Sequence, residues 1–448
     1  MKKTVTLSIA LALGASLYAD EVKTITLGMG TPGKDEPMMC GIGLSSDGKY
    51  VCGAFDQGIG IFAGNVETGE VKFEMCGEDG GELRNINNNG LALGINTLET
   101  SSSDFGMLYD YNTGEMQVLT PPNGARYIIA DDITNDNQIM VGSLSTATGT
   151  KAAYKYEGGQ WIQLPYPSAE VLGPIADLLH KGDWSGTKKI SGDGSVIYGY
   201  VGNFVLPCVW VRNDRGGYDV DFFAAKYLKV VEEDRDNPDK PFYGLSALYG
   251  LNLSNNGRYA CMLGLIEDAH GRRTNVPAVY DVFNKTLKIY EPCYDVDPKG
   301  YGFWPTAISD SGTIIGSIGQ PYFGSDGCFI WVAGEDKPQR YSEAFPTFNT
   351  QLGAGDELGM NMPTAISANG RYLLGYVWAS TTNFEEDGFW LTYIIDRGEL
   401  SGVQEIAAED TDAVPTAIYS IDGKKLNGLQ KGLNIVHMSD GSARKIMK

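Results

Sequence analysis

Proton-transfer chemistry would most simply involve histidine, and this sequence has only three, His180, His270 and His437. His270 begins the stretch His-Gly-Arg-Arg, in which a base precedes Arg272 and Arg273. Such a group would suit a polysaccharide lyase, with the imidazole as base and the guanidinium groups as a carboxylate clamp. A solvated turn explains the same residues more simply. The sequence has no Gly-x-Ser-x-Gly elbow, P-loop or dinucleotide fingerprint, so we assign no catalytic residue and no cofactor.

Two acidic clusters, at 131–136 and 234–239, are the candidates for metal binding. Neither has the Asp-x-Asp-x-Asp-Gly spacing and distal glutamate of a calcium loop, so turn chemistry is the better explanation. The seven cysteines form no CxxC pair and have no histidine at ligand spacing, which argues against zinc. A disulfide such as Cys40 to Cys52 stays open, although an odd count leaves one thiol free. We predict no metal site.

Binding chemistry has better candidates, in variable segments that join strand-like runs. These segments carry aromatic and polar side chains that would suit sugar stacking or peptide capture. The alternative is that these side chains only cap the ends of the strands. The candidate binding residues are Asp56, Phe204, Arg272, Arg273, Trp304, Tyr322, Phe323 and Trp378.

The elements that would position these residues are set by a polar turn that occurs seven times. Each copy has a small polar first residue and ends on glycine or asparagine, and another glycine follows four to seven residues later. Such residues tolerate the positive φ that a two-strand turn needs. The copies are 45–48, 87–90, 134–137, 191–194, 254–257, 309–312 and 367–370.

Successive turns are 42 to 63 residues apart, and each is followed by an aromatic-rich run and a second hairpin. Four strands at this spacing are typical of a propeller blade. The sequence therefore predicts an all-β protein with a seven-bladed β-propeller. The last copy lacks a fourth strand, and the unpartnered run 22–27 is expected to complete that blade and close the ring. The repeated turns are then structural, and the candidate binding loops lie at the opposite ends of the strands.

Composition limits the partners. The chain has 448 residues, 42% of them hydrophobic, and a net charge of −21. A surface this acidic repels phosphate backbones and anionic bilayers, so we expect no nucleic-acid partner. No apolar run is long enough to span a membrane. We expect a monomer.

The two ends of the chain have their own character. Lys2 and Lys3, followed by a short apolar run and a small residue at Ala19, predict an export signal over 1–19. The propeller would then occupy 20–398. Residues 399–416 are small and acidic, as in a linker, and 417–448 form a separate C-terminal segment.

Two resemblances support this division. The turn-and-glycine pattern, with aromatic runs such as 329–331, resembles the HAF-type repeats of bacterial secreted proteins. Residues 418–426, 429–436 and 444–446 resemble the type A sorting domain of the type IX secretion system of Bacteroidetes. That resemblance implies a small C-terminal β-sandwich, an interaction with the type IX secretion machinery, and a secreted or cell-surface location.

These observations together predict an exported β-propeller that acts as a non-enzymatic module for binding a glycan or a protein. A carbohydrate-active enzyme, such as a polysaccharide lyase, is the competing hypothesis, so the question of enzymatic activity stays open. A structural surface scaffold is the third alternative. The sequence does not identify the ligand.

Overall fold

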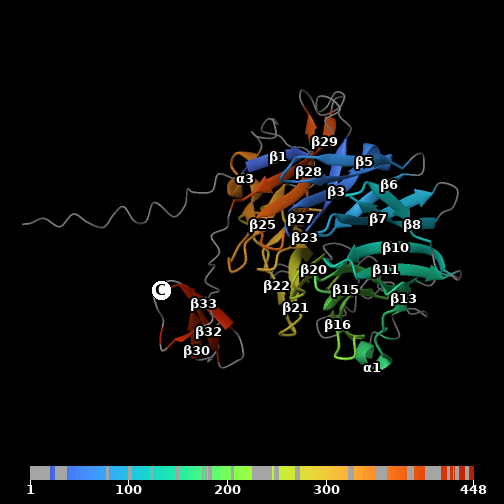
Figure 1. Cartoon of the computed structure of the whole chain (residues 1–448). Coiled ribbons are helices and arrows are strands. Elements are labelled where there is room, and N and C mark those ends of the chain that lie inside the picture. Colours follow the sequence, from blue (N-terminus) through green and yellow to red (C-terminus); the bar gives the residue numbers. More distant parts are fainter. Residues whose placement is uncertain are drawn as a thin grey trace, which may run out of the picture. The chain divides into compact units, whose positions relative to one another are not determined.

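The structure is a computed structural model, and the chain divides into two compact units, 1–400 and 401–448 (Figure 1). In the first unit it describes residues 21–25 and 38–398, with internal gaps. These gaps are 77–79, 99–102, 121, 123–124, 147–150, 174–175, 177–178, 180–183, 203–205, 225–244, 247–251, 268–272, 321–326, 349–360 and 381–387. The second unit is described over 415–420, 424–426, 428, 433–438 and 443–447. The predicted export signal, residues 1–19, lies outside the described residues.

The described part of the first unit contains seven antiparallel sheets, which confirms the predicted all-β, seven-bladed propeller. In each blade the first strand is innermost and later strands lie progressively outward. Blade 1 contains β2 (Met39–Leu44), β3 (Tyr50–Phe55), β4 (Gly60–Asn65) and β5 (Val71–Met75). Blade 2 contains β6 (Gly81–Ile86), β7 (Leu91–Leu98), β8 (Ser103–Asp110) and β9 (Glu115–Val118). Blade 3 contains β10 (Ala125–Ile133), β11 (Ile139–Thr146), β12 (Lys151–Glu157) and β13 (Gln160–Gln163).

The remaining blades follow the same order. Blade 4 contains β14 (Ser185–Ile190), β15 (Val196–Val201), β16 (Leu206–Arg212) and β17 (Tyr218–Asp221). Blade 5 contains β18 (Leu245–Ser246), β19 (Asn252–Leu253), β20 (Tyr259–Glu267), β21 (Arg273–Asp281) and β22 (Thr286–Ile289). Blade 6 contains β23 (Phe303–Ile308), β24 (Ile314–Ile318), β25 (Cys328–Trp331) and β26 (Gln339–Arg340). Blade 7 contains β27 (Asn361–Ile366), β28 (Tyr372–Ser380) and β29 (Gly388–Asp396).

The outermost position of blade 7 is taken by β1 (Glu21–Ile25), which comes from the other end of the propeller sequence. β1 pairs antiparallel with β29, from Glu21 opposite Asp396 to Ile25 opposite Thr392. The Ile25 side chain is buried in a cluster with Phe55 and Ile394. Blade 7 is thereby built from both ends of the propeller sequence.

The repeated turn between the first and second strands is here called the first turn, and in each blade the side chain of its first residue accepts a hydrogen bond from a backbone N–H that follows the turn. In blade 1, Ser45 Oγ donates to Asp47 Oδ1 at 2.6 Å and accepts from the Tyr50 backbone N–H at 2.8 Å. Gly48 closes the turn at φ +78°. The first turn residue is buried in every blade, because its side chain replaces backbone partners that the chain reversal leaves unpaired.

The second repeated glycine supports a β-bulge rather than a positive φ. In six blades the register of the first strand shifts by one residue just before the turn. Opposite this bulge lies the repeated glycine: in blade 2, Gly94 pairs with Leu83, and a Cβ on Gly94 would lie 1.9 Å from the Glu82 carbonyl oxygen. Only glycine permits this close backbone approach.

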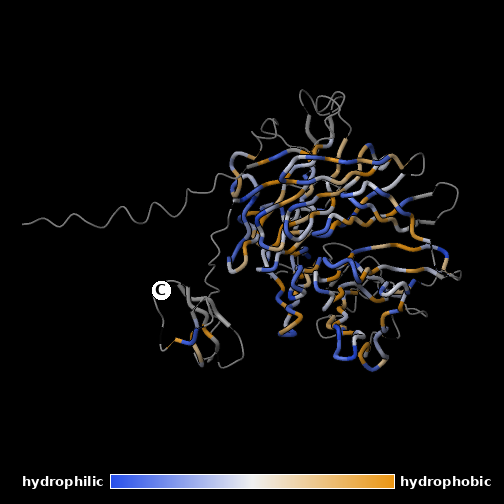
Figure 2. Tube along the Cα trace, in the orientation of Figure 1, coloured by the Kyte–Doolittle hydropathy of each residue, from blue (hydrophilic) through white to orange (hydrophobic). Residues whose placement is uncertain are grey.

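The core lies between the blades. The aromatic runs predicted from the sequence form the third strands, and six of these strands contain a fully buried aromatic side chain: Phe62, Tyr109, Trp210, Tyr280, Phe329 and Tyr393. Figure 2 shows hydrophobic and hydrophilic residues interspersed along the propeller strands, as expected for sheets with two packed faces. Two short helices, α1 (Ala169–Leu172) and α3 (Tyr341–Ala344), add to the first unit. Among the described residues, no helix has the length and apolar character needed to cross a membrane.

The described residues of the second unit form one four-stranded antiparallel sheet. Its strands are β30 (Pro415–Ser420), β31 (Lys425–Leu426), β32 (Leu433–Met438) and β33 (Ala443–Met447), in the order β31-β30-β32-β33. The predicted β-sandwich requires a second sheet, which these residues do not supply. The sandwich therefore stays a prediction.

Candidate functional site

The seven first turns meet around the propeller axis in a closed circle of hydrogen bonds, which we call the turn ring. Its members are the second residues of the seven turns: Ser46, Asn88, Asn135, Gly192, Asn255, Asp310 and Ala368. Each neighbouring pair of turns is joined by at least one hydrogen bond. These bonds are Ser46 Oγ to Asn88 Oδ1 (2.9 Å), Asn88 N to Asn135 Oδ1 (3.4 Å), Asn135 N to Gly192 O (3.0 Å), Gly192 N to Asn255 O (2.8 Å), Asn256 N to Asp310 Oδ1 (2.9 Å), Asp310 N to Ala368 O (2.9 Å) and Ala368 N to Ser46 O (2.7 Å).

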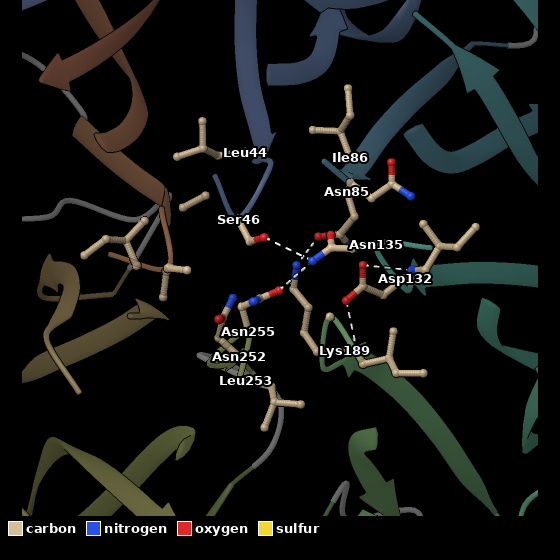
Figure 3. Close-up of a pocket in the computed structure, with 18 of the residues that line it drawn as sticks. Leu44, Ser46, Asn85, Ile86, Asp132, Asn135, Lys189, Asn252, Leu253 and Asn255 are labelled. Atoms are coloured by element: carbon tan, nitrogen blue, oxygen red, sulfur yellow. Dashed lines mark hydrogen bonds between the residues drawn. The ribbon is translucent and has the colours of Figure 1, made fainter. Parts of the chain in front are cut away.

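Asn135 extends across this ring. Its Nδ2 donates to Ser46 Oγ of blade 1 at 3.4 Å and to Asn255 Oδ1 of blade 5 at 3.2 Å (Figure 3). The intervening turn makes room for this bridge, because it has glycine at the ring position. A Cβ on Gly192 would lie 2.4 Å from Asn255 Oδ1 and 2.5 Å from Asn135 Nδ2. The bridge therefore depends on the glycine of blade 4.

A pocket, which we call the channel pocket, lies at this end of the propeller axis. It is lined by turn-ring residues and by the last two residues of the first strands (Figure 3). The residues two positions before the first turns of blades 2 to 7 form part of the wall of this pocket, and they differ in polarity between its two sides. Blades 2 to 5 contribute polar groups, Asn85, Asp132, Lys189 and Asn252. At the same position blades 6 and 7 contribute Ala307 and Ala365, so one side of the wall is polar and the other is apolar.

Asp132 and Lys189 are the charged residues of this wall, and they lie on neighbouring blades. Asp132 Oδ1 accepts from the Ile133 N–H and Oδ2 from the Ile190 N–H, each at 3.0 Å. Burial raises the pKa of Asp132 above its usual value, and the Lys189 charge and these two N–H donors offset part of the effect. Lys189 Nζ donates to Asn85 Oδ1. The wall thus presents one carboxylate, one ammonium and several amides.

The described residues that line the channel pocket include none of the binding residues predicted from the sequence. Asp56 lies at the opposite end of its blade, at φ +47°, and its Oδ1 accepts from the Met38 N–H at 2.9 Å. Trp304 is 8% exposed within β23, and Arg273 is exposed at the start of β21. Trp378 is in β28, but its side chain lies outside the described residues, as do Phe204, Arg272, Tyr322 and Phe323 entirely. Asp56, Arg273 and Trp304, the candidates whose side chains are described, do not line the channel pocket.

The sequence does not predict the channel pocket, because its turn pattern indicates a purely structural role for the first turn. That interpretation fits the first, third and fourth turn positions, which form the internal hydrogen bonds and the positive φ. The second position differs: it is Ser, Asn, Gly, Asp or Ala in different blades and faces the axis. The first, third and fourth positions are limited to small polar residues and glycine, whereas the second also includes alanine, and this wider variation was the available signal.

Other reactive groups play no visible part at this site. All seven cysteines are free thiols, so the Cys40 to Cys52 disulfide left open by the sequence is not formed. Burial raises the pKa of Cys40 to about 11, with a smaller effect from Glu82. Among the described residues, no three His, Cys, Asp or Glu side chains are grouped to hold a metal ion. His270 lies outside the described residues.

Comparisons with known proteins find similarity in structure only. No family model and no curated protein sequence matches this chain. The β-propeller domain of the Trilobed protease from Pyrococcus furiosus has a TM-score of 0.46 at 8% identity, covering 83% of this chain and 98% of that one. Oligogalacturonate lyase from Vibrio parahaemolyticus has a TM-score of 0.45 at 12% identity, covering 85% and 98%. TolB from Acinetobacter baumannii has a TM-score of 0.39 at 11% identity.

For TolB the match covers 66% of this chain and 63% of that one, so this chain spans less than two thirds of the TolB length. Similarity at this level carries no information on ligand or activity.

Proposed function

We propose that this chain is an exported binding module whose propeller holds the end of a glycan in the channel pocket. The observation that carries the proposal is the construction of that pocket: a constant framework of seven hydrogen-bonded turns presents side chains that differ from blade to blade. A fixed scaffold with variable inward groups is how a propeller obtains a specific binding site. The site lies at the first-turn end of the axis, opposite the loops expected from the sequence.

A glycan end fits the chemistry of this pocket better than a peptide segment does. The amides of Asn85, Asn252 and Asn255 carry both donors and acceptors, which hydroxyl groups require, whereas the donors of Asn135 are used within the turn ring. The alanine side gives a smooth wall for the C–H face of a sugar ring. Stacking aromatics, which the sequence favoured for sugar binding, are absent from this pocket lining. Binding therefore rests on hydrogen bonds and shape.

Ring closure and export complete the proposal. The pairing of β1 with β29 supports a role for the N-terminal strand in closing the propeller. The predicted signal at 1–19 and the resemblance of 417–448 to a type A sorting domain support transport to the cell surface or beyond. Finding the mature protein in the periplasm with its C-terminus intact would overturn the sorting assignment.

A glycan array with the mature chain tests the binding proposal. Ala368 borders the pocket and is only half-buried, so Ala368→Trp should fill the pocket and abolish binding without disturbing the core. Gln160→Trp is the matched control, because Gln160 is exposed on the outermost strand of blade 3. Binding by the wild type and the control but not by Ala368→Trp would support the proposal. Binding of no glycan, unchanged binding by Ala368→Trp, or release of sugar products would overturn it.

A further inference from the structure

We infer that the channel pocket takes a saccharide unit bearing a carboxylate, a uronic acid in chemical class, with that carboxylate at Lys189. This inference rests on the proposed function and specifies its ligand. Lys189 is the residue that decides it, because it is the cation among the residues that line the pocket.

The ammonium of Lys189 has hydrogen-bonding capacity left for a ligand. Its Nζ donates to the neutral Asn85 Oδ1, while an ammonium carries three N–H donors. Within the part of the chain that the structure describes, none of the ion pairs involves Lys189. A ligand carboxylate could accept from the N–H donors of Lys189 that Asn85 does not take, and charge-assisted bonds of this kind are among the stronger ones.

The nearby acids have partners of their own. Asp132 uses both carboxylate oxygens on the backbone N–H groups of Ile133 and Ile190. Asp131 is 4% exposed, and its Oδ2 accepts from Thr187 Oγ1 at 2.7 Å. These donors fix both carboxylates in place, and neither forms an ion pair with Lys189 among the described residues, although the Lys189 charge does act on Asp132.

The geometry of the wall favours a sugar acid over a bare anion. Lys189 lies on the polar side, on blade 4, while Ala307 and Ala365 form the opposite side on blades 6 and 7. A uronic acid has a charged group on one edge and a C–H face elsewhere, which matches both sides. An inorganic anion would leave the alanine side without a partner.

The test compares two glycosides that differ only in this group: methyl β-D-glucuronide, with a carboxylate, and methyl β-D-glucoside, with a hydroxymethyl. By calorimetry, the wild type should bind the glucuronide at least tenfold more tightly, the size of one charge-assisted hydrogen bond. Lys189→Gln should equalise the two affinities, and Lys189→Arg should keep the preference. Lys188→Gln is the matched control: it removes a neighbouring charge from the bulge, outside the pocket lining, and should leave the preference unchanged.

The outcomes separate this inference from the proposed function. Equal affinity of the wild type for both glycosides, or a preference that survives in Lys189→Gln, would overturn the inference and leave glycan binding intact. Binding of neither glycoside by a chain that binds neutral glycans on the array would do the same. A chain that binds no glycan at all would remove the proposed function together with the inference. Thermal unfolding of each variant shows that any loss is not a folding defect.

Discussion

The backbone at the second repeated glycine leaves no room for a methyl group, and this holds in six of the seven blades. A Cβ on Gly53, Gly199 or Gly316 would lie 2.0 to 2.1 Å from a carbonyl oxygen of the neighbouring strand. Contacts this short do not occur between real atoms, so a side chain there must displace backbone. The glycines therefore allow the bulges to form, and the bulges orient the residues that line the channel pocket.

Blade 5 supplies a natural control for this argument. Gly264 lies two residues beyond the register position of the bulge glycines, which Met262 occupies in this blade, and a Cβ on Gly264 would lie 3.4 Å from both Ala278 Cβ and Val276 O, an ordinary contact. We expect Gly94→Ala to lower the free energy of unfolding by about 2–4 kcal/mol, since it overpacks backbone against backbone. Gly264→Ala should change it by less than about 1 kcal/mol. Urea unfolding of both variants makes the comparison, and equal effects would show that the bulge does not require glycine.

At the scale of elements, the sequence predicts strands and turns well because their determinants are local. Hydrophobic alternation, positive φ at Gly48 and its equivalents, and the aromatic third strands depend on neighbouring residues. The channel pocket could not be predicted in the same way. It combines Asn85, Lys189 and Ala365 from separate blades, and which residues face the axis depends on a bulge that a single residue inserts.

The edge strand β1 gives a prediction at this scale. Without residues 20–25, β29 exposes an open edge, and the burial of Val22 and Ile25 is lost. We expect the truncated chain to lose about 3 kcal/mol of stability, since each aliphatic side chain contributes about 1.5–3 kcal/mol when fully buried, and to aggregate more readily. A synthetic peptide of residues 20–27 added in trans should restore thermal stability, and a scrambled peptide should not. A truncated chain as stable and soluble as the full one would show that β1 is dispensable.

At the scale of the whole molecule, the net charge of −21 makes the response to acid a sum of opposing contributions. Asp396 and Asp132 have pKa values shifted in opposite directions. Burial raises the pKa of Asp396, but its two bonds to Arg371 and the Gly398 N–H outweigh this, so the net pKa is lowered. At Asp132, burial prevails and the pKa is raised. The protein therefore contains acids that favour folding at neutral pH and acids that oppose it.

The direction in which stability changes with pH depends on whether the folded or the unfolded state binds the proton more readily. An unfolded aspartate titrates near pH 4. The folded state binds a proton at Asp396 less readily than the unfolded state, so its contribution to stability is complete above about pH 4 and is lost as the pH falls through the folded pKa. At Asp132 the folded state binds the proton more readily. Its carboxylate therefore costs stability increasingly as the pH rises from about 4 towards the raised pKa.

Replacing each carboxyl by its neutral isostere separates the two contributions. The stability difference between wild type and Asp396→Asn should shrink as the pH falls from 5 to 3, because the wild type loses its ion pair and the variant has none to lose. For Asp132→Asn, the stability of the variant relative to wild type should instead rise as the pH increases above 4, whatever the absolute effect of changing its hydrogen bonds. Chemical unfolding at several pH values measures both slopes. We define each slope as the change with pH of the wild-type stability minus the variant stability. This slope should be positive for Asp396→Asn and negative for Asp132→Asn. Slopes of the same sign would mean that Asp132 is not in a less polar environment than Asp396.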